Sequence, residues 1–262
     1  MRTAGKVSGV AWIASGEARP SVPSLMLIHG AGGNSSGWWQ QFERFAPARH
    51  VIALDLPGFG LSDPPPADVG IADTLARGVI NVLAEQQVQR ADLVCQSLGG
   101  WAGVRAAMAR PDLISSLVLC CTLAGIDHPP GVEAFRSAAK QMDTRGPAAL
   151  GLQPAFEAAY PAKARLYRQI GAANPPPDPA WGAQLFARDA LVRPDQLADL
   201  TMPVTLIMGE NDPIWPPASL AGMLAPARAR EIILPAAGHS PYFEHPDAFN
   251  AVLAEVLGIG AS

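Results

Sequence analysis

The chain has 262 residues, of which 49% are hydrophobic and 16% are charged, and its formal net charge is −4. This composition predicts a folded protein with a large apolar core and excludes a disordered chain. The small negative charge gives no electrostatic basis for binding nucleic acid or an anionic membrane.

The sequence shows no sign of a membrane span, a signal peptide or a disulfide framework. No apolar run approaches the roughly 18 residues needed to cross a bilayer, and no apolar stretch follows the first residues of the chain. Cys95, Cys120 and Cys121 all fall within predicted strands, which favours buried thiols over disulfides or a metal site. These features predict a cytoplasmic protein without a metal or another cofactor.

Short apolar runs alternate with amphipathic segments, a pattern typical of βαβ units and a mostly parallel sheet. Residues 6–16 are expected to supply one or two antiparallel strands at the sheet edge. Near-continuous apolar runs, as strands buried on both faces require, predict central strands at residues 24–29, 50–55, 91–96, 115–121, 203–209 and 229–234. Helices are predicted at residues 70–88, 98–109, 217–224 and 241–257.

The alternation stops between residues 124 and 200. This stretch has almost no β-branched run, carries spaced aromatic and aliphatic residues, and contains two proline clusters, Asp127-His-Pro-Pro and Asn174-Pro-Pro-Pro-Asp-Pro. We interpret residues 124–200 as a helical cap inserted between two strands, with residues 1–123 and 201–262 forming one core.

The predicted strand at residues 91–96 runs directly into Ser97, which Leu98 and two glycines follow before a helix-compatible sequence. A sharp strand-to-helix turn needs small residues, because the two backbones pass close together. Such a turn exposes the serine hydroxyl above the sheet edge and leaves the next backbone N–H free to bind an oxyanion. The usual pattern is Gly-x-Ser-x-Gly, and here Cys95 replaces the first glycine.

A serine hydroxyl becomes a strong nucleophile only when a base removes its proton and a third group orients that base. His239 lies in a loop between the last predicted strand and the last predicted helix, which makes it the candidate base. Asp212 directly follows a strand and is the candidate acid. Two rivals for the acid remain: Glu210, close by in the same loop, and Asp127, after the strand that follows the Ser97 helix.

The chain order Ser97, Asp212, His239 is that of the α/β-hydrolases. Four further strings resemble this family: Ile28-His-Gly-Ala-Gly-Gly-Asn, Asp55-Leu-Pro-Gly-Phe-Gly-Leu-Ser, Gly209-Glu-Asn-Asp and Gly238-His-Ser-Pro-Tyr-Phe-Glu-His-Pro. The chain therefore resembles a capped α/β-hydrolase of the serine esterase, lactonase or C–C hydrolase kind. The resemblance implies a mostly parallel sheet of eight strands, or slightly fewer, flanked by helices, with a helical cap after the sixth strand.

By this resemblance, Ser97 attacks an acyl carbon, His239 shuttles the proton, and Asp212 orients His239. The resulting oxyanion is expected to bind the backbone N–H groups of Leu98 and, by resemblance alone, Ala31.

The substrate pocket is expected to include Trp38, Trp101 and Tyr160. The apolar side chains of residues 124–200 predict an apolar roof over Ser97, and so a preference for small to medium, uncharged carboxylic esters. Arg165 and Arg168 in that segment are candidates for pairing with a substrate carboxylate, and a solvated helix face is the favoured alternative for both.

Four functions remain open. Ser97 disfavours the epoxide hydrolases and dehalogenases, which use an aspartate nucleophile, and Ser240 stands where the C–C hydrolases usually carry a tryptophan. We therefore predict a carboxylesterase that acts on a small-molecule ester through an acyl-enzyme. A C–C hydrolase or a lactonase with the same triad is the alternative within this class. A non-catalytic binding protein of the same fold is the alternative outside it, and the presence of all three triad members favours an enzyme.

Overall fold

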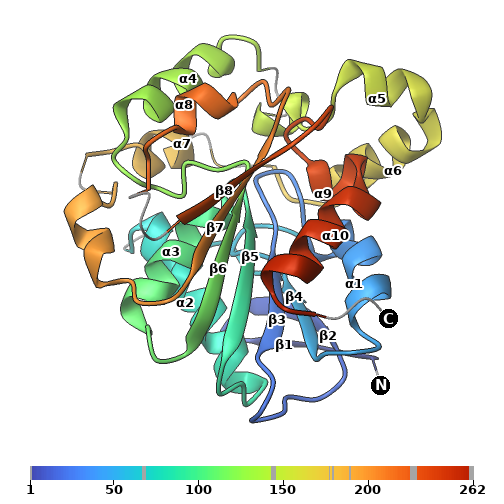
Figure 1. Ribbon diagram of the computed structural model, residues 1–262, viewed down its shortest axis with the longest axis vertical. Coiled ribbons are helices and arrows are strands. Elements are labelled where there is room, and N and C mark those ends of the chain that lie inside the picture. Colours follow the sequence, from blue (N-terminus) through green and yellow to red (C-terminus); the bar gives the residue numbers. More distant parts are fainter. Residues whose placement is uncertain are drawn as a thin grey trace.

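The computed structural model describes residues 2–66, 69–142, 146–176, 178, 180–188, 190–224 and 229–259. In this part of the chain, eight strands form one sheet: β1 (Arg2–Val7), β2 (Val10–Ser15), β3 (Ser24–Ile28), β4 (Val51–Leu54), β5 (Ala91–Gln96), β6 (Ile114–Cys120), β7 (Val204–Gly209) and β8 (Ala229–Leu234). Their order across the sheet is β1-β2-β4-β3-β5-β6-β7-β8 (Figure 1). The β1–β2 and β2–β4 pairs are antiparallel, and all other pairs are parallel. The predicted α/β fold with a mostly parallel sheet is confirmed.

The α-helices of the described residues are α1 (Trp39–Phe45), α2 (Ile71–Glu85), α3 (Gly99–Ala109), α4 (Pro129–Ala139), α5 (Pro154–Ala159), α6 (Pro161–Ala172), α7 (Ala180–Leu185), α8 (Pro217–Leu220), α9 (Pro241–Glu244) and α10 (Pro246–Val256). Short 3-10 helices lie at η1 (Ser35–Trp38), η2 (Gly146–Leu150) and η3 (Pro194–Asp199). Among the described residues, none of these helices combines the length and the apolar character required for crossing a bilayer.

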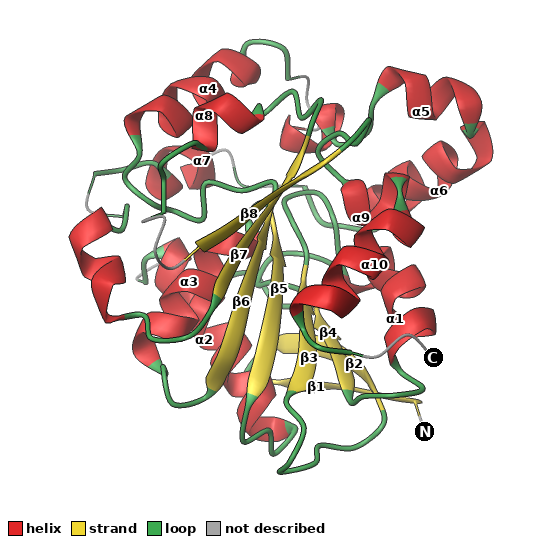
Figure 2. Cartoon of the chain, in the orientation of Figure 1, coloured by secondary structure: helices red, strands yellow, loops and turns green. Residues whose placement is uncertain are grey.

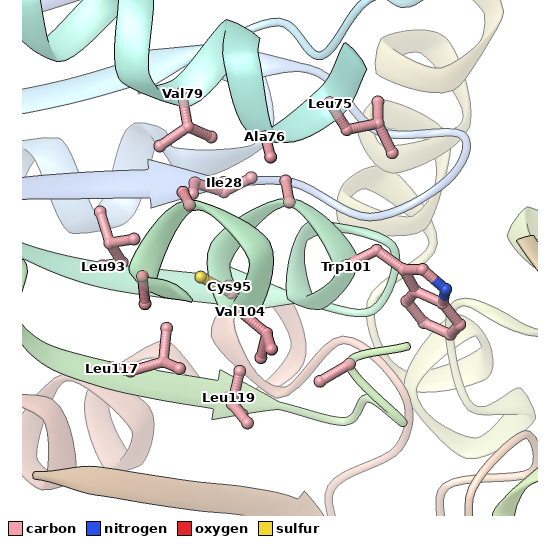
Figure 3. Close-up of a cluster of buried hydrophobic side chains, with 14 of the residues drawn as sticks. Ile28, Leu75, Ala76, Val79, Leu93, Cys95, Trp101, Val104, Leu117 and Leu119 are labelled. Carbon is pink, nitrogen blue, oxygen red and sulfur yellow. The ribbon is translucent and has the colours of Figure 1, made fainter. Parts of the chain in front are cut away.

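Helices cover both faces of the sheet (Figures 1 and 2). Successive side chains of a strand point to opposite faces, so each central strand contributes to two apolar clusters. In β3, Met26 and Ile28 belong to the cluster with α2 and α3, part of which Figure 3 shows, whereas Leu25 and Leu27 belong to the cluster with α1 and α10. With both faces covered, the loops at the carboxyl ends of the parallel strands are the open part of the sheet, where sites in such folds form.

Residues 124–200, here called the insertion, lie between β6 and β7 and contain α4, η2, α5, α6, α7 and η3. Figure 2 shows the insertion's α-helices at the upper end of the sheet. Val132 and Leu185 belong to the first apolar cluster, and Phe156 and Ala164 belong to the second. The insertion therefore buries its apolar side chains against the rest of the protein and not in a separate core.

The predicted helix at residues 241–257 is in fact two helices, α9 and α10, which meet at His245 and Pro246. A proline interrupts a helix because it lacks an N–H and clashes with the preceding turn, but it fits the first position of a new helix. The helix predicted at 217–224 is also shorter, since α8 ends at Leu220 and Gly222 has a φ of +73°.

Candidate active site

Ser97 lies in the turn between β5 and α3 with a φ of +50°, a conformation that a residue with a side chain seldom adopts. Such a residue typically costs about 1–3 kcal/mol and persists only when its surroundings hold it. The Ser97 N–H donates to the carbonyl of Cys120 (3.0 Å), and the Thr122 hydroxyl donates to the Ser97 carbonyl (2.6 Å). Residues at the end of β6 therefore hold the turn on both sides of its strained residue.

The glycines of this turn are required by close packing. A Cβ on Gly99 would lie 2.6 Å from a backbone carbonyl of β3, and one on Gly100 would lie 2.4 Å from the Thr122 hydroxyl oxygen. Cys95 fits in place of the usual glycine because α3 carries Gly103 opposite it, where a Cβ would lie 2.3 Å from the cysteine sulfur. Burial raises the pKa of the Cys95 thiol, so this side chain stays protonated and acts as packing.

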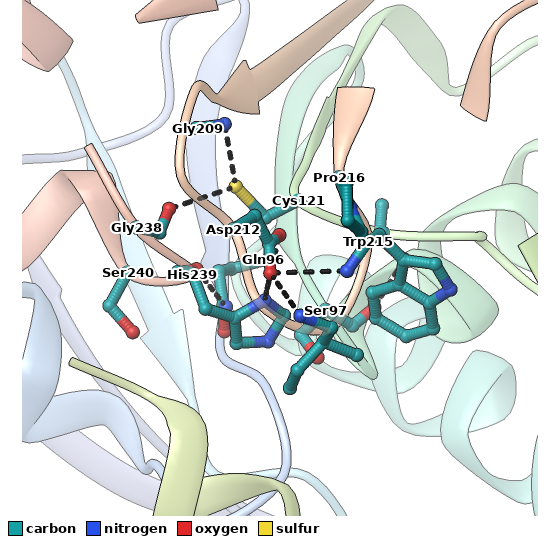
Figure 4. A network of polar contacts seen from close by, with 12 residues as sticks. Gln96, Ser97, Cys121, Gly209, Asp212, Trp215, Pro216, Gly238, His239 and Ser240 are labelled. Carbon is teal, nitrogen blue, oxygen red and sulfur yellow. Dashed lines mark hydrogen bonds and ion pairs between the residues drawn. The ribbon is translucent and has the colours of Figure 1, made fainter. Parts of the chain in front are cut away.

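Asp212 and His239 follow β7 and β8 and are hydrogen-bonded to each other (Figure 4). His239 Nδ1 lies 3.0 Å from Asp212 Oδ2 and 3.1 Å from Oδ1. The Asp212 carboxylate also accepts the backbone N–H groups of Ile214 (2.8 Å) and Trp215 (3.2 Å). Asp212 and His239 are buried. An acceptor on Nδ1 fixes the imidazole tautomer with its free nitrogen at Nε2, the form that a general base at a serine requires.

Neither rival carboxylate takes this place. The Glu210 carboxylate is exposed and accepts the backbone N–H of Ala236 (2.8 Å), and the backbone of Asp127 pairs with Val192 in the insertion. Among the described residues, Asp212 is the carboxylate that contacts His239.

Two residues that the sequence analysis missed hold the His239 loop. Gln96, the residue before Ser97, donates from Nε2 to the His239 carbonyl (3.0 Å). Glu244 accepts the Ser240 N–H (3.1 Å) and the N–H of Gln153 from the insertion (3.3 Å). Burial raises the pKa of the Glu244 carboxyl. A glutamine directly before the serine, at the end of a mostly apolar strand, was the available sequence signal for the first of these residues.

The loop after β3 lies directly against Ser97. A Cβ on Gly30 would come within 2.7 Å of the Ser97 Cβ. Ala31 and Leu98 line the same cavity as Ser97. Within the described part of the chain, no protein group accepts a hydrogen bond from either of these backbone N–H groups. Both amides are therefore available for an oxyanion.

His29 connects this loop to the end of β4. Its Nδ1 lies 2.8 Å from the Gly30 carbonyl, to which it donates, and its Nε2 accepts the Leu56 N–H (2.9 Å). Both contacts together require the neutral ring, and burial lowers the pKa of His29 below its ordinary value of 6.5. His29 therefore acts as a structural residue of the loop.

The lowered pKa of His29 predicts a loss of stability in mild acid. Below about pH 6.5 the unfolded chain binds a proton at this residue and the folded chain does not, so the free energy of unfolding falls until the folded-state pKa is reached. Thermal unfolding followed by calorimetry should show a lower Tm at pH 5.5 than at pH 7.5, with a shallower pH dependence in His29→Gln. An equally steep dependence in that variant would contradict this assignment.

A cavity of about 590 Å³ opens at Ser97 between the core and the insertion. Trp101 lines it, and the other aromatic side chains that do so are Phe59, Phe135, Tyr167, Trp181, Phe186 and Trp215. Phe135 stacks on Phe186 with ring centroids 4.3 Å apart, and the Trp215 ring lies 5.8 Å from that of His239. The polar side chains of the described lining include Tyr167, Arg168 and Asn174. The cavity wall is thus largely apolar and aromatic.

Trp38 and Tyr160 do not line this cavity, which corrects the expectation for both. Trp38 is fully buried in the cluster with α1 and α10, with its ring 4.2 Å from that of Tyr242. Tyr160 lies between α5 and α6, is 51% exposed, and packs against Phe156. An aromatic residue in the sequence carries no signal for the face on which its element will pack.

Among the described residues, no group of three or more His, Cys, Asp or Glu side chains is arranged to hold a metal ion.

Comparisons with known proteins agree with this architecture. The model of the alpha/beta hydrolase family matches residues 25–252. A pimeloyl-[acyl-carrier protein] methyl ester esterase from Pseudoalteromonas atlantica is 30% identical over 252 residues, which cover 90% of this chain and 94% of the relative.

Two solved structures share the fold. An esterase from Thermogutta terrifontis superposes with a TM-score of 0.78 at 24% identity over 98% of both chains. The 2-hydroxy-6-oxo-6-phenylhexa-2,4-dienoate hydrolase from Rhodococcus sp. strain RHA1 gives a TM-score of 0.72 at 19% identity over 97% of both chains. The resemblance inferred from the sequence motifs is confirmed: the chain belongs to the alpha/beta hydrolase family.

Proposed function

We propose that this protein is a serine carboxylesterase that cleaves small to medium, uncharged, mainly apolar esters, with Ser97, His239 and Asp212 as its catalytic triad. The observation that carries the proposal is the buried Asp212–His239 hydrogen bond beside a serine held at a φ of +50° at an apolar cavity. The 30% identical relative is named a methyl ester esterase, which supports ester cleavage.

In the first half of the reaction, Ser97 Oγ attacks the acyl carbon while its proton passes to His239 Nε2. The carbonyl oxygen becomes an oxyanion and binds the N–H groups of Ala31 and Leu98. Asp212 stabilises the imidazolium. When the intermediate collapses, the bond to the alcohol oxygen breaks, His239 returns its proton to the leaving alcohol, and an acyl-enzyme remains.

In the second half, water takes the place of the alcohol. His239 removes one proton from this water as its oxygen attacks the acyl carbon, and the same two amides bind the second oxyanion. The Ser97–acyl bond then breaks, His239 returns the proton to Ser97 Oγ, and the carboxylic acid leaves. His239 and Asp212 have the same roles in both halves, whereas Ser97 is the nucleophile in the first half and the leaving group in the second.

The insertion serves as a cap that shapes the substrate site in this proposal. It supplies Phe135, Trp181 and Phe186 to the aromatic wall. An apolar wall favours apolar substrate groups and excludes water, which strengthens the hydrogen bonds to an oxyanion. The insertion therefore sets both the preference for uncharged esters and the environment of the reaction.

The position of Arg168 favours the alternative function, which is cleavage of a carboxylated ring-fission product. It lines the cavity, whereas Arg165 on the same helix is exposed and does not. The Arg168 guanidinium pairs with Glu157 (2.5 Å), and its side chain is 46% exposed. Because this cation already has a carboxylate partner and contact with solvent, we assign it to the cavity mouth and retain the ester proposal.

The test compares kcat/KM for neutral p-nitrophenyl esters of increasing chain length with kcat/KM for a carboxylated ring-fission dienoate. We expect the neutral esters to be preferred by about 10-fold or more, since an apolar pocket gives a carboxylate no compensation for lost hydration. Arg168→Ala should leave this preference in place, and Arg165→Ala is the matched control on the same helix.

A strong preference for the dienoate that disappears in Arg168→Ala and persists in Arg165→Ala would replace the esterase proposal with C–C hydrolysis. Faster turnover of lactones than of open-chain esters would instead assign the protein as a lactonase.

A further inference from the structure

We propose that Asn174, in the insertion, is a positioning residue for the oxyanion-binding amide of Ala31. The insertion would then help to build the catalytic centre as well as enclose the substrate. This inference rests on the proposed function, because an oxyanion forms only if Ser97 attacks an acyl carbon.

The amide of Ala31 belongs to a tight turn at Gly30–Gly33. The Gly33 N–H donates to the Gly30 carbonyl (3.0 Å), and Gly32 has a φ of +79°, as the third residue of a type II turn requires. A trans peptide is planar and directs its N–H opposite to its C=O. Since the Gly30 carbonyl is bound by Gly33 and by His29, the Ala31 N–H must point the opposite way, and its direction depends on whether this turn is held.

Asn174 binds the far end of this turn. Its Nδ2 donates to the Gly33 carbonyl (3.1 Å), and its Oδ1 accepts the Gly60 N–H (2.8 Å) from the loop after β4. Asn34, the next residue after the turn, contacts Asn174 Oδ1 (3.3 Å) and donates to the Ile170 carbonyl of α6 (2.9 Å). One side chain of the insertion therefore connects the loops that follow two central strands.

The packing around the turn leaves little room for another arrangement. A Cβ on Gly32 would lie 2.5 Å from the Ala148 Cβ, and one on Gly171 would lie 3.0 Å from the Gly32 carbonyl. Both partners come from the insertion. The backbone of Asn174 is itself restricted, because its N–H donates to the Gly171 carbonyl (3.1 Å) and Pro175 follows it. The side-chain amide is thus presented to the turn from a defined position.

Loss of the contact between Asn174 and Gly33 is expected to weaken binding of the transition state and not binding of the substrate. If the contact from Asn174 to Gly33 is lost, the turn gains freedom and the Ala31 N–H is aimed less well at the oxyanion. The substrate still binds, because the aromatic wall is intact. An interaction made only in the transition state lowers kcat and leaves KM nearly unchanged when it is removed.

The experiment uses three variants of the full chain. Asn174→Ala removes both contacts, and Asn174→Asp keeps the acceptor for Gly60 but loses the donor to Gly33. Gln169→Ala is the matched control, because Gln169 is also a side-chain amide of the insertion and is exposed on α6, the helix that precedes Asn174. For each, we would measure kcat and KM on a p-nitrophenyl ester and the affinity of the corresponding trifluoromethyl ketone. Ser97 Oγ adds to the carbonyl carbon of this ketone, and the serine proton passes to His239. The former carbonyl oxygen becomes negative and occupies the position of the oxyanion.

We expect kcat to fall by about 10- to 100-fold in both Asn174 variants. Loss of a whole oxyanion donor typically lowers kcat by about 10²–10³, and here the donor remains but is aimed less well. KM should change by less than about threefold, and affinity for the ketone should fall by the same factor as kcat/KM. Gln169→Ala should keep the kcat of the wild type. Hydrogen–deuterium exchange should be faster at residues 30–36 in the Asn174 variants alone.

Wild-type kcat and ketone affinity in both Asn174 variants would overturn the inference, as would an equal loss of kcat in Gln169→Ala. The exchange measurement separates this failure from failure of the proposed function. It needs no substrate, so an unchanged exchange rate rejects the role of Asn174 in holding the turn even if the wild type cleaves no ester.

Discussion

Replacing Ser97 with alanine is expected to abolish ester turnover, with a fall in kcat on the order of 10⁶. The hydroxyl is the proposed nucleophile, and the remaining amides of Ala31 and Leu98 stabilise charge without forming the acyl-enzyme. Covalent labelling by a fluorophosphonate probe should disappear together with turnover. The Tm should stay within a few degrees of the wild-type value, because the hydrogen bonds that hold the turn involve the Ser97 backbone.

Ser36→Ala is the matched control, since this serine lies in η1, which follows β3, and it is exposed. It should keep both turnover and labelling. If the label persists in Ser97→Ala and maps to Ser35 or Ser240, the nucleophile is wrongly assigned. If the wild type does not react with the probe and turns over no ester, lactone or ring-fission dienoate, the protein is a binding protein with an enzyme fold.

Asp212→Asn is expected to lower kcat by about 10⁴, as loss of the orienting carboxylate does in serine hydrolases of this kind. The carboxylate accepts the proton on His239 Nδ1 at 3.0 Å. An asparagine amide can donate to that nitrogen instead, which favours the tautomer that has its proton on Nε2 and is unable to accept the serine proton. The change is measured as kcat for a neutral p-nitrophenyl ester over a range of pH.

Glu210→Gln and Asp127→Asn are the controls for this experiment. Glu210 binds the Ala236 N–H, so its change should affect kcat by less than about tenfold. A near-normal rate in Asp212→Asn together with a collapse in Asp127→Asn would move the acid to the loop after β6.

The catalytic candidates were predictable because each lies where a strand ends. Ser97 follows β5, Asp212 follows β7, and His239 follows β8. The carboxyl ends of parallel strands meet at one edge of a sheet, so residues far apart in sequence arrive together once the strands are recognised. The glycines at positions 99 and 100 were informative for a related reason, since close backbone packing permits no side chain there.

Other expectations were wrong because a local pattern does not show which other segments an element packs against or where a helix is interrupted. The periodicity of residues 241–257 suggested one helix, although Pro246 begins a second one. Trp38 and Tyr160 are expected in the pocket, but Trp38 packs in the core and Tyr160 lies at the surface.

By itself, then, the sequence determined the α/β fold, the helical character of the insertion and the three catalytic candidates, because these depend on periodicity, turn chemistry and chain order. Only the tertiary structure decided that Asp212 and not Glu210 or Asp127 contacts His239, that Trp101 lines the cavity while Trp38 does not, and that Asn174 reaches the Gly30–Gly33 turn. These are contacts between segments that lie 27 or more residues apart. Such contacts depend on how distant loops and helices pack together over the sheet, for which a sequence carries no local signal.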